Sequence, residues 1–310
     1  MTLPLRGIIP PLITPLKDHD ELDVEGLERL IAHLLEQGVH GIFLLGTNGE
    51  GPSLSYRLRH ELVGEACRII GGRVPVLVGI TDTSMEGSLE VARMAKEQGA
   101  DAVVIAPPFY FPLDQEQVIE YYRALARRLP LPFFIYNMPS HTKIHLEVES
   151  VVRIKEKTGA LGIKDSSGDQ FYFYSLIDAL GGDPSFSLIT GTEMFIPDAI
   201  LHGAHGAVPG GANVFPALFV QMFEASTRRD LKEIERLCSS VMKIYNTLYR
   251  VSDRPARITL GIKTALSVMG ICNDVMAPPL KKMDREERAG VENALREIQE
   301  SLSSMIFTRS

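Results

Sequence analysis

The sequence predicts a (β/α)8 barrel, the TIM-barrel fold class, followed by a C-terminal appendage of three helices. Eight apolar, β-rich runs recur along the first part of the chain, with amphipathic helical patterns between most of them. Most of these runs are apolar without alternation, as expected for parallel strands covered on both faces. A chain of 310 residues with 45% hydrophobic residues can bury such a core. A doubly wound sheet is the alternative, but it rarely needs eight such units.

The predicted strands follow one another at fairly even intervals. They cover residues 6–14, 39–47, 74–81, 100–108, 131–139, 160–167, 185–192 and 204–211. In a barrel all eight strands are parallel, and the side chains at their carboxyl ends share one face. Candidate reactive groups are therefore sought where each run ends.

Amphipathic helices are predicted between the strands, for example over residues 23–38, 53–72 and 84–100. Ser53 and Ser84 are the expected N-caps, because a serine hydroxyl can accept a hydrogen bond from a free backbone N–H of the first turn. Gly38 and Gly99 are expected just past helix ends, where the left-handed conformation favours glycine.

No further strand is predicted after the eighth run. The last barrel helix is expected over 214–229, and three more helices over 230–250, 256–270 and 285–304. The sequence therefore divides into a catalytic barrel domain, residues 1–229, and a helical domain, residues 230–310. The apolar spacing of the added helices indicates packing against the barrel or against a neighbouring subunit.

Composition and charge exclude several classes of function. The net charge of −7, with no cluster of basic and aromatic residues, argues against a nucleic-acid surface. The N-terminal segment is broken by prolines and does not resemble a signal peptide, and no apolar run is long enough to span a membrane. Cys67, Cys238 and Cys272 show no metal-ligand spacing. We expect a cytoplasmic protein with reduced thiols and without nucleic-acid or membrane partners.

Polar side chains gather at the ends of five predicted strands. They are Thr47, Asn48, Glu50, Tyr110, Tyr136, Asn137, His141, Lys164, Asp165, Thr192 and Glu193. Strands five and six are neighbours in an eight-fold barrel, about 4.8 Å apart, so Tyr136 and Lys164 are expected to meet at its mouth.

Lys164 interrupts an apolar run, and burial of its ammonium requires an explanation. Desolvation disfavours the charged form, which lowers a lysine pKa and leaves an amine able to attack a carbonyl. Tyr136 would then transfer protons during formation and breakdown of the imine. The alternative is that Lys164 forms an ion pair with Glu50, Asp165 or Glu193.

Four segments at these strand ends carry a family resemblance. They are GTNGEGPSLS (46–55), YNMPSHT (136–142), GIKDSSGD (162–169) and GAHGAVPGGAN (203–213). In this order they resemble the carboxylate-binding loop, the tyrosine segment, the Schiff-base lysine segment and the strand 8 signature of the pyruvate-dependent class I aldolases. That family includes dihydrodipicolinate synthase and N-acetylneuraminate lyase. The resemblance spans nearly the whole chain; on its own, GTNGEG would indicate no more than a tight turn.

The resemblance implies roles for individual residues. Lys164 would form the imine with a keto acid, Tyr136 would be the acid/base, and Thr47, with Asn48 beside it, would hold the carboxylate. Tyr110 would extend the proton relay, in many relatives across a subunit interface. The backbone of Val208 would lie near bound pyruvate. The resemblance also implies a homotetramer whose substrates are a 2-keto acid and an aldehyde. It implies no metal, and no cofactor other than the covalent imine on the lysine.

Departures from the family pattern bear on the substrate. Dihydrodipicolinate synthases typically carry an arginine at the position of His141, and histidine lacks its bidentate fork. Asn48 replaces a second threonine, and the extended GEGPSLS resembles the sugar-acid branch. Thr192 and Glu193 could bind hydroxyls of a polyol, although Glu193 could equally be solvated. We favour a 2-keto-3-deoxy sugar-acid aldolase or lyase, with dihydrodipicolinate synthase as the alternative.

Two other classes of protein stay open. A metal-dependent class II aldolase would need clustered ligands at the strand ends, which the histidines do not supply. Most of them lie in predicted loops, helices or turns: His19, His33, His40, His60, His202 and His205. A catalytically silent sugar-acid binding protein would not require Lys164 and Tyr136 together.

Overall fold

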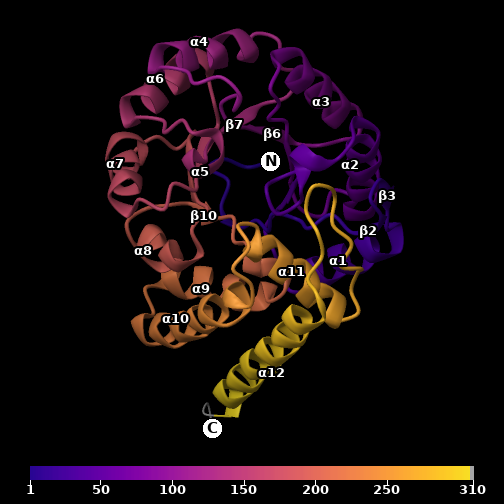
Figure 1. Ribbon diagram of the computed structural model, residues 1–310. Helices are drawn as coiled ribbons and strands as arrows, with labels where there is room; N and C mark the ends of the chain where they lie inside the picture. Colours follow the sequence, from indigo (N-terminus) through magenta and orange to yellow (C-terminus); the bar gives the residue numbers. More distant parts are fainter. Residues whose placement is uncertain (308–310) are drawn as a thin grey trace.

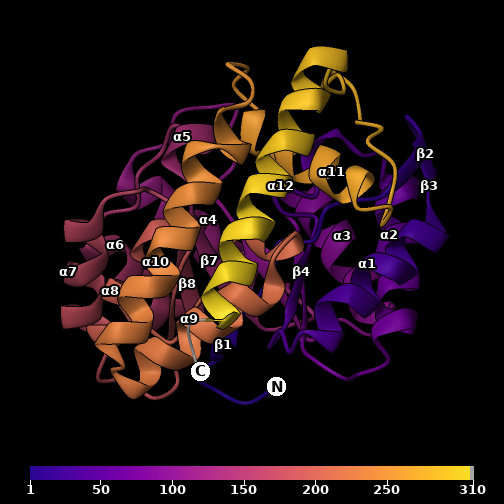
Figure 2. The same ribbon diagram turned by 90° about the horizontal axis from the view of Figure 1, so that it is seen from below.

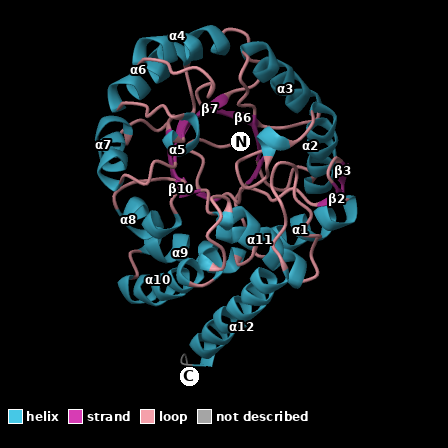
Figure 3. Cartoon of the chain, in the orientation of Figure 1, coloured by secondary structure: helices cyan, strands magenta, loops and turns pink. Residues whose placement is uncertain are grey.

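The computed structural model describes residues 1–307 and confirms the predicted barrel (Figure 1, Figure 3). Within this part of the chain, eight strands form one parallel sheet in the order β1-β10-β9-β8-β7-β6-β5-β4. The strands are β1 (Gly7–Ile8), β4 (Ile42–Leu44), β5 (Val76–Gly79), β6 (Ala102–Ile105), β7 (Phe133–Asn137), β8 (Gly162–Asp165), β9 (Ser187–Thr190) and β10 (Gly206–Ala207). A parallel bridge between Pro11 and Phe43 joins the two ends of the sheet and closes the barrel.

Helices surround the sheet as a ring in Figure 1. They are α1 (Val24–Glu36), α2 (Tyr56–Ile70), α3 (Met85–Glu97), α4 (Gln115–Ala126), α6 (Val148–Thr158), α7 (Gln170–Leu180), α8 (Ile196–Leu201) and α9 (Pro216–Arg228). The hydroxyl of Ser84 caps α3 as predicted, by accepting from Gly87 N. Ser53 is not a cap, because it lies in the 3-10 turn η1 (Gly51–Ser53), and Ser55 caps α2 instead.

A short antiparallel hairpin, β2 (Leu16–Asp18) with β3 (Glu21–Leu22), lies between β1 and α1 and was not predicted. Its strands have three and two residues, too few for a periodic pattern. It stands outside the barrel, at the edge of the ring of helices (Figure 1).

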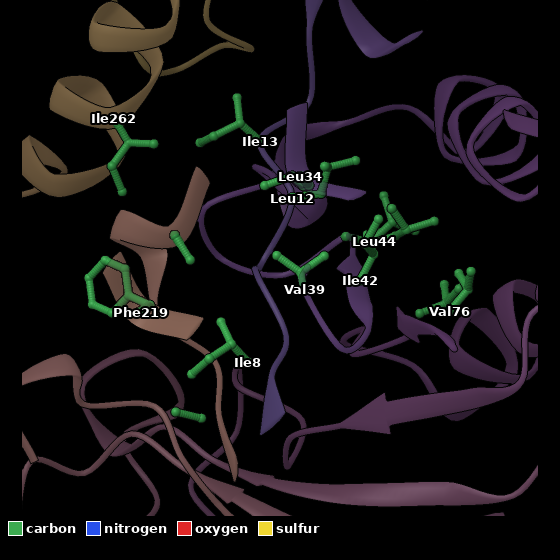
Figure 4. Packing of buried hydrophobic residues seen from close by; sticks show 14 of the residues in the cluster. Ile8, Leu12, Ile13, Leu34, Val39, Ile42, Leu44, Val76, Phe219 and Ile262 are labelled. Atoms are coloured by element: carbon green, nitrogen blue, oxygen red, sulfur yellow. The ribbon is translucent and has the colours of Figure 1, made fainter. Parts of the chain in front are cut away.

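The strands carry apolar side chains on both faces, which is why their sequences read as continuous apolar runs. Along β7, for example, Phe134 and Tyr136 belong to the cluster inside the barrel, whereas Phe133 and Ile135 pack between the sheet and the helices. Figure 4 shows part of the outer cluster, in which Ile262 of the C-terminal region lies near Phe219 and Ile13.

The three C-terminal helices are α10 (Leu231–Asn246), α11 (Arg257–Val268) and α12 (Arg285–Phe307). α10 packs against α9 (Figure 2). α11 contacts the 3-10 turn η3 (Gly210–Asn213), which follows β10. Of the helices described, none combines the length and the hydropathy that a membrane crossing requires. The division into domains 1–229 and 230–310 stays a prediction, and residues 308–310 lie outside the described part.

Candidate active site

Lys164 and Tyr136 meet at the mouth of the barrel, as the neighbouring strands predicted. They are direct partners in the register of β7 and β8. Lys164 Nζ lies 4.0 Å from the centroid of the Tyr136 ring and 5.0 Å from that of Phe43. The Lys164 residue is only 7% exposed. The amine therefore lies between two aromatic faces and largely out of water.

The carboxylates that were considered as ion-pair partners of Lys164 bind other groups. Glu50 forms a fully buried ion pair with Lys263, with Nζ to Oε1 at 2.6 Å. Asp165 points away from the barrel interior and accepts a hydrogen bond from Asn137 Nδ2 at 2.8 Å. Because side chains alternate along a strand, Asp165 and Lys164 project from opposite faces of β8.

The third candidate partner, Glu193, is held by hydrogen bonds. Its Oε1 accepts from Gly211 N at 2.7 Å and from Tyr249 Oη at 3.0 Å. Burial raises the pKa of Glu193, and these hydrogen bonds offset only part of that rise. Glu193 is therefore not a solvated group, and its carboxylate already accepts hydrogen bonds from the protein. Each of the three carboxylates considered as an ion-pair partner of Lys164 binds another group.

The phenol of Tyr136 has an unusual electrostatic environment. Burial alone would raise its pKa, but the positive charge of Lys164 and a hydrogen bond with its amine act in the opposite direction. Hydrogen bonds with the side chains of Thr47 and Ser166 lower it further, so the pKa of Tyr136 lies below its ordinary value. A phenol with a lowered pKa exchanges its proton more readily at neutral pH.

A cavity of about 570 Å³ opens above this pair. Thr47, Tyr136 and His141 are shared with an adjoining cavity of about 270 Å³ that is lined mainly by apolar side chains. The larger cavity also contains the other predicted binding residues, namely Asn48, Thr192, Glu193 and Val208. The structure thus brings together all the predicted site residues except Tyr110.

The loop after β4 is a tight turn with a buried centre. Glu50 N donates to Thr47 O at 3.0 Å, and Thr14 Oγ1 donates to Gly49 O at 2.6 Å. A Cβ on Gly49 would lie 2.7 Å from Leu12 O, so only glycine fits there. The side chain of Asn48 is already engaged, because its Oδ1 accepts from Thr259 Oγ1 at 3.0 Å.

His141 lies at the rim of both cavities, in the short helix α5 (Pro139–Thr142) that follows β7. Partial desolvation lowers its pKa, and the positive charges of Lys143 and Lys164 lower it further. The ring is therefore neutral at pH 7. It offers hydrogen bonds to a ligand but not the positive charge of an arginine.

Tyr110 is the predicted site residue that the chain does not bring to Lys164. It is 75% exposed and forms an edge contact with Phe111, which is 72% exposed. Phe109, the preceding residue, is 40% exposed and lines the smaller cavity. Such a run of exposed aromatic side chains is typical of a protein interface.

Several residues of the site were not predicted. Ser166 comes directly after β8, two residues beyond Lys164, and lines the larger cavity. The C-terminal region adds four more polar side chains. These are Tyr245, Tyr249, Thr259 and, behind the loop, Lys263. Lys263 carried the same signal as Lys164, a lysine within an apolar run. Among the described residues, no group of three or more His, Cys, Asp or Glu side chains could hold a metal ion.

Comparison with known proteins agrees with this geometry. Residues 4–298 match the Dihydrodipicolinate synthetase family. An uncharacterized DapA-like lyase of Halobacterium salinarum is 31% identical over 296 residues, which cover 96% of this chain and 95% of the relative. The dihydrodipicolinate synthase structure from Bacteroides thetaiotaomicron is 48% identical, with a TM-score of 0.93, and the match covers 96% of this chain and 100% of that one.

A second solved structure was determined with a ligand. It is the chloride-inhibited dihydrodipicolinate synthase of Acinetobacter baumannii complexed with pyruvate, 28% identical, with a TM-score of 0.88 and coverage of 95% of this chain and 99% of that one. The family match covers nearly the whole chain, and both solved structures share its barrel and its C-terminal helices. The protein therefore belongs to the dihydrodipicolinate synthetase family and is a lyase of the class I aldolase type.

Proposed function

We propose that this protein is a pyruvate-dependent aldolase that forms a Schiff base at Lys164 and acts on a 2-keto acid of the 2-keto-3-deoxy sugar-acid type. One observation carries the assignment of the lysine. Lys164 Nζ lies over the Tyr136 ring, inside a cavity, while the three neighbouring carboxylates bind other groups. The amine is therefore held beside the phenol and within reach of a ketone bound in the cavity.

In the proposed reaction, the amine of Lys164 gives up a proton and adds to the C2 carbonyl of the keto acid. The carbinolamine then takes up a proton and loses water, which leaves a protonated imine at C2 that draws electrons from the bond between C3 and C4. Cleavage of that bond, with transfer of the C4 hydroxyl proton to Tyr136, releases an aldehyde and leaves the enamine of pyruvate. Protonation of the enamine and hydrolysis of the imine return pyruvate and the free amine, and Tyr136 transfers the protons.

The loop after β4 is the proposed carboxylate site. Thr47 lines both cavities, and its side chain hydrogen-bonds with Tyr136. A hydroxyl and the backbone N–H groups of a tight turn suit a carboxylate, because they donate hydrogen bonds without adding charge. The carboxylate of the keto acid would thus lie next to the phenol and its ketone next to Lys164. No metal and no further cofactor enters this scheme.

The chemistry of the larger cavity favours a sugar acid over a substrate with two carboxylates. Its lining offers many hydroxyls, whereas Lys164 is the one Lys or Arg among the lining residues and would be consumed in the imine. The hydroxyl groups come from Thr47, Ser53, Tyr136, Ser166, Thr192, Tyr245, Tyr249 and Thr259. Such a lining can pair with an uncharged polyol but leaves a second carboxylate without a cation.

The alternative function is dihydrodipicolinate synthase, which condenses pyruvate with aspartate semialdehyde. The identity of 48% to a structure described by that name favours it. Arg59 is the one Lys or Arg that lines the smaller cavity and is therefore the candidate cation for the second carboxylate. However, Arg59 faces Asp82 at 3.6 Å and donates to the carbonyl of Leu54, so its charge is already compensated.

Borohydride reduction in the presence of pyruvate tests the Schiff base. We expect a stable adduct on Lys164, heavier by pyruvic acid less one oxygen atom, located by peptide mapping. Lys263 is a built-in control, because it is also buried but paired with Glu50. An adduct on another lysine, or none, would refute the assignment of Lys164.

A panel of aldehydes with pyruvate, read by product mass, tests the substrate class. We expect products from uncharged polyhydroxy aldehydes such as glyceraldehyde, and little product from aspartate semialdehyde. Efficient condensation of pyruvate with aspartate semialdehyde would overturn the preference for a sugar acid and leave the Schiff base intact.

We also propose a homotetramer in the cytoplasm. The exposed side chains of Phe109, Tyr110 and Phe111 support an interface at which Tyr110 reaches the site of a partner. The thiols of Cys67, Cys238 and Cys272 are free, as in a reducing compartment. Light scattering of the parent and of Tyr110→Ala, together with cell fractionation, tests both points.

A further inference from the structure

We propose that the C-terminal helix α11 positions the carboxylate-binding loop, and that Lys263, Glu50 and Thr259 are positioning residues for pyruvate. This inference rests on the proposed function, because it assumes that Thr47 and its loop hold the keto-acid carboxylate. None of the three residues is proposed to touch the reacting atoms.

The first contact joins α11 to the end of the loop. Lys263 Nζ lies 2.6 Å from Glu50 Oε1, and both side chains are fully buried. The other carboxylate oxygen, Oε2, accepts from Ala277 N at 2.7 Å. Both oxygens of Glu50 are therefore bound by groups that lie more than two hundred residues away along the chain.

The backbone of Glu50 has a conformation that is disfavoured for glutamate. Its φ of 57° is left-handed, which is disfavoured for residues other than Gly, Asn and Asp. Glu50 N nevertheless closes the turn on Thr47 O at 3.0 Å. The ion pair with Lys263 thus fixes a strained residue whose own amide sets the position of Thr47.

The second contact lies one helical turn earlier on α11. Thr259 Oγ1 donates to Asn48 Oδ1 at 3.0 Å. Residues 259 and 263 are four apart, so they lie on the same face of the helix. One face of α11 therefore binds both side chains that flank the centre of the loop, Asn48 and Glu50.

On its other side the loop contacts the segment that follows β1. Thr14 Oγ1 donates to Gly49 O, and the missing side chain of Gly49 lets the loop approach Leu12 O. The loop is clamped between the N-terminal segment and α11. Its donors are aligned only while α11 is docked, and the affinity for the carboxylate depends on helices that stand outside the barrel.

Titration of pyruvate in the borohydride reaction tests this positioning. The double variant E50Q/K263M removes the ion pair and leaves no unpaired charge in the interior. We expect the half-saturating pyruvate concentration to rise about tenfold, the effect of losing one hydrogen bond to a charged group, with the same final yield of adduct on Lys164. Methyl pyruvate has no anionic carboxylate, and its half-saturating concentration should stay close to that of the parent.

A milder variant keeps the test valid if the double variant does not fold. Thr259→Val preserves the shape of the side chain and removes the donor to Asn48, and we expect about a threefold rise for pyruvate. Asp183→Asn is the matched control, because it removes an ion pair with Lys155 on the outer surface of the barrel. Its half-saturating pyruvate concentration should be unchanged.

The outcomes separate this inference from the proposed function. If the parent enzyme forms no adduct at Lys164, the proposed function fails. If the parent forms the adduct but folded variants bind pyruvate as the parent does, only the positioning role is wrong. Equal rises for pyruvate and methyl pyruvate would also overturn it, because they would place the effect on Lys164 and not on the carboxylate.

Discussion

The buried ion pair between Glu50 and Lys263 gives a quantitative prediction about stability. Both side chains are fully buried, with 2.6 Å between Nζ and Oε1, and the second oxygen of Glu50 binds Ala277 N. Glu50→Gln keeps the size of the side chain but leaves the Lys263 ammonium in the interior without a counter-charge. Removing one partner of such a pair costs about 3–5 kcal/mol of the free energy of unfolding.

The pair between Lys155 and Asp183 provides the comparison. Its side chains are 26% and 25% exposed, so water solvates both charges when the pair is broken. Hydrogen bonds with Lys155 and Ser185 lower the pKa of Asp183 to about 2, so for Asp183→Asn we expect a loss of up to about 2 kcal/mol, still below the loss for Glu50→Gln. Each single variant replaces a carboxylate by its amide, so the difference between their losses of stability reports the effect of burying the ion pair.

Equilibrium unfolding in urea measures both losses. The chain has no tryptophan, so the transition is followed by far-UV circular dichroism, at one protein concentration for all variants because assembly shifts apparent stability. The double variant E50Q/K263M should recover most of the loss, since it leaves no unpaired charge. If Glu50→Gln loses no more than Asp183→Asn, the reasoning from burial is refuted.

Three further predictions concern the site and its surroundings. Tyr136→Phe should slow turnover by about 10²–10⁴-fold and still allow the pyruvate adduct to be trapped, because the ring stays and the proton donor is lost; undiminished turnover would remove Tyr136 from the relay. His205 Nδ1 accepts a hydrogen bond from Leu188 N, and burial lowers the pKa of the ring from 6.5 to about 4. The neutral ring therefore stabilises the fold fully above pH 6.5. As the pH falls toward 4, up to about 3 kcal/mol of the free energy of unfolding is lost. Unfolding curves at several pH values should show a smaller loss over this range in His205→Gln, and equal slopes would contradict the assignment. Gly49→Ala should raise the half-saturating pyruvate concentration because its Cβ would lie 2.7 Å from Leu12 O, whereas Gly182→Ala, which has open space, should not.

The barrel and the central pair could be predicted because their physical causes are local. Continuous apolar runs identify strands covered on both faces, and parallel strands place their carboxyl ends on one face. Tyr136 and Lys164 then had to be neighbours, since successive strands pair in a barrel. The register confirms this. The start of α2 was misplaced because Ser53 and Ser55 are both good caps, and a 3-10 turn uses the first.

The role of the C-terminal helices could not be predicted in the same way. Their apolar stripes indicated packing, and packing alone does not say which polar side chains face a cavity. Tyr249 bonds Glu193 across 56 positions and Thr259 bonds Asn48 across 211. No periodicity links residues so far apart, so contacts of this kind depend on where a helix docks.

By itself, the sequence determined the barrel, the strand ends that carry reactive groups and the lysine that interrupts an apolar run, because each follows from the hydrophobicity and spacing of neighbouring residues. Only the tertiary structure decided that Glu50 forms its ion pair with Lys263 and not with Lys164, that Glu193 is held by Tyr249, and that Tyr110 is exposed and lines neither cavity. The physical reason is that the partner of a charged side chain depends on distances in space, and these distances depend on how the whole chain packs.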